Sequence, residues 1–286
     1  MMRRSCRTLL ALVIPGTCIQ TCFAHSPFSS QGEDAYAALL STLLLVSIHA
    51  LYTFGSWHTR PRAWQQISFH AGMVICYLAA LGPLDDWAKT STTAHMVQHM
   101  TFMMIVTPLW VIASPLPAFY RCGKIWLRLW QPFLKLVRYP MLMAYIHGAT
   151  IWFWHLPYFY TLALDNVWWH IIEHACFIIT AGLFWWSVLK SNHLQAHWAL
   201  LASLLTLMHT GFLGALLTFA GQPLYGDSRS LADQQLAGLI MWVPGAAPYL
   251  CAACWAAARW YRQRMYRAPV FRDQSHTQAE SHRTAD

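Results

Sequence analysis

Apolar residues along this chain gather into seven long blocks separated by short polar segments. The blocks cover residues 35–57, 64–84, 94–115, 139–158, 167–189, 197–219 and 235–258. About 20 apolar residues in a helix span a bilayer core of about 30 Å. Backbone groups cannot stay unpaired in lipid, so each block is predicted to be a helix. The pattern therefore predicts an all-α, polytopic membrane protein whose seven-helix transmembrane domain covers residues 35–260.

The composition agrees with this class. Hydrophobic residues make up 57% of the 286 residues and charged residues only 10%, which is too few charges to cover a soluble domain of this length. The net charge of +8 would also suit a nucleic-acid partner. However, the basic residues form no single patch and recur between alternate apolar blocks, so membrane lipid is the expected surrounding and nucleic acid is not.

The distribution of charge predicts the orientation. Twelve basic residues flank alternate blocks, at Arg60, Arg62, Arg121, Lys124, Arg128, Lys135, Arg138, Lys190, Arg259, Arg262, Arg264 and Arg267. Only Lys89 and Arg229 lie in the remaining connections, together with most of the acidic residues. Basic loops stay in the cytoplasm, so the mature N-terminus is predicted outside and the C-terminus inside.

The two ends of the chain differ from the middle. Residues 1–24 predict a secretory signal peptide, with Arg3, Arg4 and Arg7 before an apolar stretch and Cys22 and Ala24 at the cleavage site. If this peptide is not cleaved, it forms an additional anchoring helix. Residues 25–34 would be a short periplasmic segment. Residues 261–286 are predicted to be a polar, disordered cytoplasmic tail.

Two histidine pairs stand inside the apolar blocks, as His95-Met-Val-Gln-His99 and His170-Ile-Ile-Glu-His174. Residues four apart share one helix face, and ionisable groups at membrane depth indicate function. The predicted orientation places both pairs in the outer third of the membrane, with His155 at a similar depth. We therefore expect a metal or cofactor site there, although hydrogen bonds to neighbouring helices or to interfacial water would also account for the histidines.

Other side chains near this level extend the candidate site. Imidazole suits copper and zinc, while the thioethers of Met96 and Met100 would favour Cu(I) or simply fill gaps in helix packing. Glu173 would bind the metal, orient an imidazole, or be buried in its protonated form. His209, near mid-membrane, would extend the site inward. Asp233, at the outer mouth of the last block, would bind hydrated cations, orient the histidines or cap the helix.

Several further motifs carry less weight. His49, His70 and His147 are isolated and are interpreted as structural. Cys251-x-x-Cys254 lies among alanines and suits close helix packing better than a thiol metal relay. The His170-x-x-Glu-His174 pattern also matches an inverted zinc-protease motif, but only in three residues and without a soluble catalytic domain, so no enzyme is predicted.

The chain resembles the CtaG-type cytochrome c oxidase assembly factors of bacterial inner membranes. In the family's order it has His95-Met-Val-Gln-His99, Trp154-His155-Leu156-Pro157, His170-Ile-Ile-Glu-His174 with Phe184-Trp185-Trp186, Gly214-Ala-Leu-Leu-Thr-Phe219 with Pro223-Leu-Tyr225, and Asp233-Gln-Gln-Leu-Ala-Gly238 with Met241-Trp242. These motifs span the third to seventh blocks; the first two blocks and the tail match only in general character. The resemblance implies a multi-pass inner-membrane protein that helps to mature a haem–copper oxidase by supplying copper.

The resulting hypothesis is a non-catalytic assembly factor of the respiratory chain. His95, His99, His170 and His174 would bind one copper ion, with His155 and Glu173 in support. Its partners would be the oxidase subunit that carries the haem–copper centre and a periplasmic copper donor. Two alternatives stay open, a haem- or quinone-binding membrane protein, since paired imidazoles can be axial haem ligands, and a copper transporter. The sequence leaves open whether the protein carries copper or chaperones a folding subunit.

Overall fold

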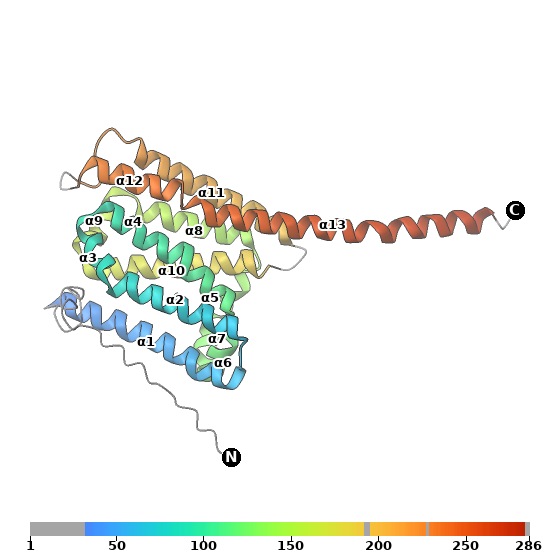
Figure 1. Ribbon diagram of the computed structural model, residues 1–286, viewed down its shortest axis with the longest axis horizontal. Coiled ribbons are helices and arrows are strands. Elements are labelled where there is room, and N and C mark those ends of the chain that lie inside the picture. Colours follow the sequence, from blue (N-terminus) through green and yellow to red (C-terminus); the bar gives the residue numbers. More distant parts are fainter. Residues whose placement is uncertain (1–31, 192–194, 227–228, 284–286) are drawn as a thin grey trace, which may run out of the picture.

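The computed structural model describes residues 32–191, 195–226 and 229–283, and its regular structure within these ranges is entirely helical (Figure 1). The elements are α1 (Glu33–Thr59), α2 (Ala63–Leu81), α3 (Pro83–Thr90), α4 (Thr92–Thr101), the π-helix η1 (Phe102–Val106), α5 (Thr107–Ala113), α6 (Leu116–Cys122), α7 (Lys124–Leu136), α8 (Pro140–Trp154), α9 (Pro157–Asp165), α10 (Val167–Leu189), α11 (Ala196–Thr218), α12 (Leu231–Trp242) and α13 (Ala246–Arg283). The predicted all-α class is confirmed. The predicted signal peptide lies outside the described residues.

Among the described residues, five segments are long and apolar enough to cross a membrane. A sixth exists if α2 and α3, which meet at a bend of 42°, count as one span. The expected fourth span, 139–158, is divided instead: α8 has 15 residues and ends at Trp154, and Pro157 begins α9. Proline fixes the start of a helix because its own N–H is absent. Several membrane spans are thus supported, while the number seven, the orientation and the cleavage stay predictions.

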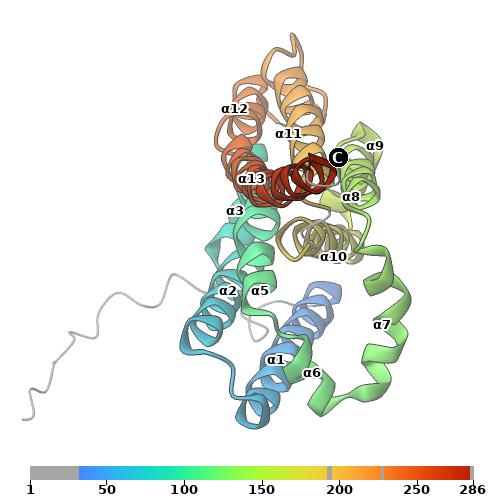
Figure 2. The same ribbon diagram turned by 90° about the vertical axis from the view of Figure 1, so that its right-hand side faces the viewer.

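The core of the bundle lies among α8, α10, α11, α12 and the first part of α13 (Figures 1 and 2). We call the end of the bundle where α4, α10 and α12 begin the outer end, following the predicted orientation. Helix α1 lies at the edge and packs chiefly on α6, so that only 11% of its apolar span is buried. The first helix is therefore the least integrated member of the bundle.

Helices α11 and α12 approach closely through glycine. A Cβ atom on Gly238 would lie 2.6 Å from the carbonyl oxygen of Gly214 and from the backbone nitrogen of Thr218. No side chain fits between backbones at such a distance. The contact sets the position of α12, whose first turn reaches the N-terminus of α4.

The third apolar block forms one span, Thr92–Ala113, that contains the π-helix η1. Pro108 follows this segment and has no N–H to donate, so the regular α-helical ladder cannot continue through it. The Thr107 N–H bonds back to the carbonyl of Phe102, and the Met103 carbonyl accepts from the indole of Trp185 at 2.7 Å. Such π-bulges occur often at functional sites.

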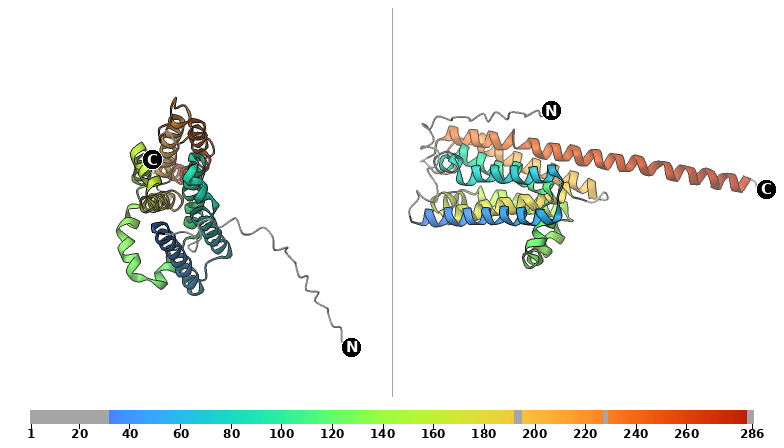
Figure 3. Two further views of the ribbon diagram at one scale, coloured as in Figure 1. Left: turned by 90° about the vertical axis from the view of Figure 1, so that its left-hand side faces the viewer. Right: turned by 60° about the horizontal axis from the view of Figure 1, so that its bottom comes forward.

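The last helix continues beyond the bundle. Helix α13 runs to Arg283 and projects as a single helix away from the other elements (Figures 1 and 3). It includes most of the 261–286 segment, for which the sequence predicted no regular structure.

Candidate metal centre

The two histidine pairs face one another at the outer end of the bundle. His95 and His99 lie in the first two turns of α4, and His170 and His174 lie in the first two turns of α10. Ring centroids are 5.5 Å apart for His95 and His170 and 5.3 Å apart for His99 and His174. One ring nitrogen each from His95, His99 and His170 falls within a 4.8 Å group. The sequence placed the two pairs at one depth, and the structure brings their rings close together.

Local sequence explains why both helices begin just before their histidines. The Asn166 side chain accepts hydrogen bonds from the backbone N–H groups of Trp168 and Trp169 and caps α10. Ser91 caps α4 by accepting from the N–H of Ala94. These caps satisfy donors that a helix start leaves unpaired. Each pair is thereby held one turn inside the bundle.

Glu173 lies between the imidazoles and is buried. Its Oε2 atom is 3.7 Å from Nε2 of His95 and 3.6 Å from Nε2 of His99. These separations are too long for hydrogen bonds. Within the described part of the chain, Glu173 Oε2 and the Nε2 atoms of His95, His99, His170 and His174 are buried with no hydrogen-bond partner. Polar atoms in such places usually have partners, so their gathering points to a ligand.

His155 adds a further donor atom nearby. Its Nδ1 donates to the carbonyl of Ile151 at 2.7 Å, which leaves the lone pair on Nε2. That Nε2 is also buried and has no partner among the described residues. The hydrogen bond to the backbone is the kind that fixes one tautomer of a metal-binding imidazole. The break between α8 and α9 places this residue at the end of its helix.

Asp233 binds the N-terminus of α4 and so joins two helices. Its carboxylate accepts from the backbone N–H groups of Thr92 at 2.5 Å and Thr93 at 3.3 Å, and from the Ser91 hydroxyl at 3.0 Å. Of the roles that the sequence left open, these contacts match capping, although the helix capped is α4 rather than its own. A carboxylate at a helix N-terminus also interacts favourably with the helix dipole.

Arg229 closes the outer side of the cluster. The residue is buried and donates to the carbonyls of Ala88 and Lys89 and to the hydroxyl of Thr92. Its guanidinium also lies over the ring of Tyr160 at 5.8 Å. The planar, five-donor guanidinium suits such multiple contacts. In the sequence this residue is recognisable only as a charge on the outer side, because the groups that accept its hydrogen bonds on α3 and α4 lie about 140 residues earlier.

The loop between α11 and α12 completes this cover. Tyr225 stacks on Tyr160 with centroids 3.7 Å apart, and its hydroxyl donates to the His155 carbonyl at 3.3 Å. The Leu224 N–H donates to the side chain of Gln234 at 2.7 Å. Tyr225 and Gln234 are both buried. The cluster is therefore covered toward the outer end by side chains from three elements.

Three sequence candidates lie elsewhere. Met96 is buried in the main hydrophobic core, and the Met100 methyl group packs beside Gly245. These positions match the packing interpretation of the methionines. His209, on α11, lies against Gly148 of α8, and both its ring nitrogens are buried without a partner among the described residues. His209 is not part of the group of ring nitrogens around His95. The inward extension of the metal site through His209 therefore gains no support.

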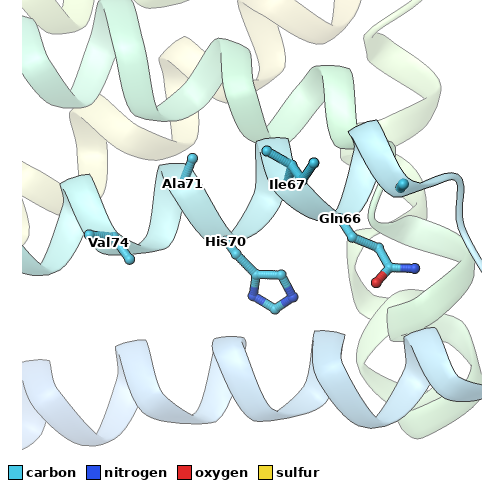
Figure 4. Close-up of a pocket in the computed structure, with 6 residues that line it drawn as sticks. Gln66, Ile67, His70, Ala71 and Val74 are labelled. Atoms are coloured by element: carbon cyan, nitrogen blue, oxygen red, sulfur yellow. The ribbon is translucent and has the colours of Figure 1, made fainter. Parts of the chain in front are cut away.

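The isolated histidines have partners after all. His49 and His70 approach at 2.9 Å between ring nitrogens, and Tyr77 lies 3.4 Å from His49. Figure 4 shows His70 pointing from α2 toward α1, beside an open surface hollow. His147 bonds to Thr180 and Tyr249. These contacts support a structural role for the three residues, and periodicity alone could not have revealed them.

Gln98 was not identified from the sequence. It is buried on α4, and its amide nitrogen donates at 2.8 Å both to the Ala79 carbonyl and to Asp85. It thus ties the α4 turn between His95 and His99 to α2 and α3. A glutamine inside an apolar block was a signal for such a bond, since a buried amide requires partners.

Comparison with known proteins identifies the family of the chain. The family model for the cytochrome c oxidase caa3 assembly factor (Caa3_CtaG) matches residues 50–263. No curated protein and no solved structure gives a match. The matched region contains both histidine pairs, His155, Glu173 and Asp233. The chain therefore belongs to the cytochrome c oxidase caa3 assembly factor family.

Proposed function

We propose that this assembly factor binds one copper ion with His95, His99, His170 and His174, supported by His155 and Glu173, and passes it to the oxidase. The observation that supports the proposal is the group of buried donor atoms without hydrogen-bond partners among the described residues. Leaving such atoms unpaired costs about 1–3 kcal/mol each. An ion held by these atoms would recover that free energy.

The donor set suits copper as cargo. Neutral imidazoles are good copper ligands, and more candidates are present than one ion needs, which would allow ligands to exchange during transfer. The Glu173 carboxylate would balance part of the ion's charge. Neither Asp233 nor Arg229 is a proposed ligand. Asp233 holds the start of α4, and Arg229 holds the end of α3 against the loop between α11 and α12. In this proposal the outer end faces the periplasm of the bacterial inner membrane, where a copper donor would meet it.

Copper stoichiometry tests the proposal in purified protein. Wild-type protein equilibrated with buffered Cu(I) should retain about one ion, and the His95→Ala/His99→Ala/His170→Ala/His174→Ala variant should lose it. The matched control is His49→Ala/His70→Ala, which removes a histidine contact outside the cluster and should retain the ion. Equal binding by all three proteins would refute the site. A Soret band in the purified wild type would favour a haem protein instead.

The oxidase itself tests the cellular role. In a strain that lacks this gene, the haem–copper subunit should retain haem and lose copper, and the wild-type gene should restore the copper. The four-histidine variant should accumulate in the membrane without restoring it. Loss of the whole subunit would indicate that the protein chaperones folding rather than delivering the ion.

A further inference from the structure

A cavity beside the histidine cluster opens between α1, α2, α3 and α10. Its volume is about 270 Å³. Its wall contains His170 and His174, whose Nε2 atoms are buried and lack partners among the described residues. The histidine cluster thus borders a cavity much larger than one ion. This cavity lies beside the cluster, on the side of α1.

The outer side of the cluster is the better closed of the two. Arg229, Tyr160 and Tyr225 cover it through stacking and several hydrogen bonds, and Asp233 fixes α4 beside them. Removing this cover would break many polar contacts at once. Among the described residues, most of the cavity lining is apolar and belongs to helix faces.

Polar groups mark one end of the cavity. Asp34, from the first turn of α1, lines it together with Asp85 and Lys89 of α3. All three lie near helix ends at the outer end of the bundle, where an aqueous compartment would reach them. Carboxylates there would raise the local concentration of cations. His170 and His174, whose Nε2 atoms have no partner among the described residues, line the same cavity further along α10.

Helix α1 forms the outermost wall of the cavity, and its two halves are held differently. Seven of its residues line the cavity, and all but Ile48 belong to its first half: Asp34, Ala37, Ala38, Ser41, Leu44, Leu45 and Ile48. The second half is fixed: Gly55 contacts the Ala118 backbone, and Tyr52 stacks on Phe69 with centroids 3.7 Å apart. The two halves of α1 therefore differ in their neighbours: most of the cavity-lining residues lie in the first half, and the second half packs on α2 and α6.

We propose that copper reaches the histidine cluster laterally, entering between Asp34 and Asp85 and passing through the cavity behind α1 to His170 and His174. This inference rests on the proposed function, because it concerns the route to that site. The first half of α1 would then form one wall of the entry path. The ion would enter bare or weakly liganded, attracted by the carboxylates of Asp34 and Asp85.

Loading kinetics test the route. Ser41→Trp places an indole in the cavity, and Leu43→Trp, on an exposed position of the same helix, is the matched control. Stopped-flow mixing with Cu(I) from a bicinchoninate buffer should show loading at least tenfold slower in Ser41→Trp, with about one ion still bound at equilibrium. The control should load at the wild-type rate. A wild-type rate in Ser41→Trp would overturn the route.

A second variant separates blocking of the cavity from misfolding, in case Ser41→Trp does not fold. Ser41→Cys, in a background whose native cysteines are replaced by serine, is labelled after folding with a bulky methanethiosulfonate and later released by reductant. Labelling should slow loading and release should restore it; unchanged loading would overturn the route. If wild-type protein binds no copper, the proposed function fails. If it binds copper and the labelled protein loads normally, only the route fails.

Discussion

Asp233 provides the sharpest test of how the site is held. The sequence alone left three roles open for it, namely binding hydrated cations, orienting the histidines and capping a helix. Its contacts with α4 are those of a cap. Replacing Asp233 by Ala removes the acceptor from the backbone N–H groups of Thr92 and Thr93. The third free N–H of α4, on Ala94, keeps its bond to Ser91. The substitution therefore unpairs two of the donors at this helix start.

The magnitude follows from these bonds. Losing an N-cap acceptor costs about 1 kcal/mol, and a hydrogen bond to a charged group is worth about 1.5–3 kcal/mol. Asp233 is half-buried, so water replaces part of what is lost. We expect Asp233→Ala to lower the free energy of unfolding by about 2–3 kcal/mol, which corresponds to a fall in Tm of roughly 5–10 °C. Asp233→Asn keeps one oxygen acceptor and should cost about half as much.

Thermal unfolding followed by tryptophan fluorescence, together with hydrogen exchange at Thr92 and Thr93, measures this effect. Both amides should exchange faster in Asp233→Ala. The loss of copper affinity should not exceed the loss of stability, because Asp233 is not among the proposed ligands and acts only by holding α4. A variant Asp233→Asn that keeps its Tm and loses copper binding would show instead that the carboxylate is a ligand, and the capping argument would be wrong.

Three further predictions concern packing and the cluster. Gly238→Ala should lower the Tm clearly, because its Cβ would meet the α11 backbone, while Gly182→Ala, with open space around it, should be neutral or slightly stabilising; thermal melts compare them. Trp185→Phe should destabilise by about 0.5–1.5 kcal/mol, because the Met103 carbonyl loses its indole donor and keeps the Thr107 hydroxyl; an unchanged denaturation midpoint would contradict this role. Glu173→Gln should weaken Cu(I) binding by about 10–100-fold in a competition titration, whereas equal affinity would remove Glu173 from the site.

Much of the site could be predicted because four-residue spacing and helix direction determine depth. Once α4 and α10 were both taken to begin at the outer end, their histidine pairs had to lie at one level, and the structure brings them together. Glu173, for which the sequence left three roles open, lies within 3.7 Å of both His95 and His99. It could not select the faces that the methionines occupy, because a helix in lipid has no polar side to fix its rotation.

Long-range polar contacts were beyond the reach of local patterns. Arg229 and Asp233 bind residues about 140 positions earlier in the chain, and Gln98 bonds to a carbonyl of another helix. Each of these depends on how helices pack, which hydropathy does not encode. The end of α8 at Trp154, shortly before the end of the fourth block, had a local signal in Pro157.

X-ray absorption at the copper edge of loaded wild-type protein measures the ligands most directly. The account predicts a first shell of imidazole nitrogens with the outer-shell scattering typical of histidine, and its loss in the four-histidine variant. A sulfur shell, which would assign the ion to cysteine or methionine, or an unchanged spectrum in that variant, would contradict the central claim.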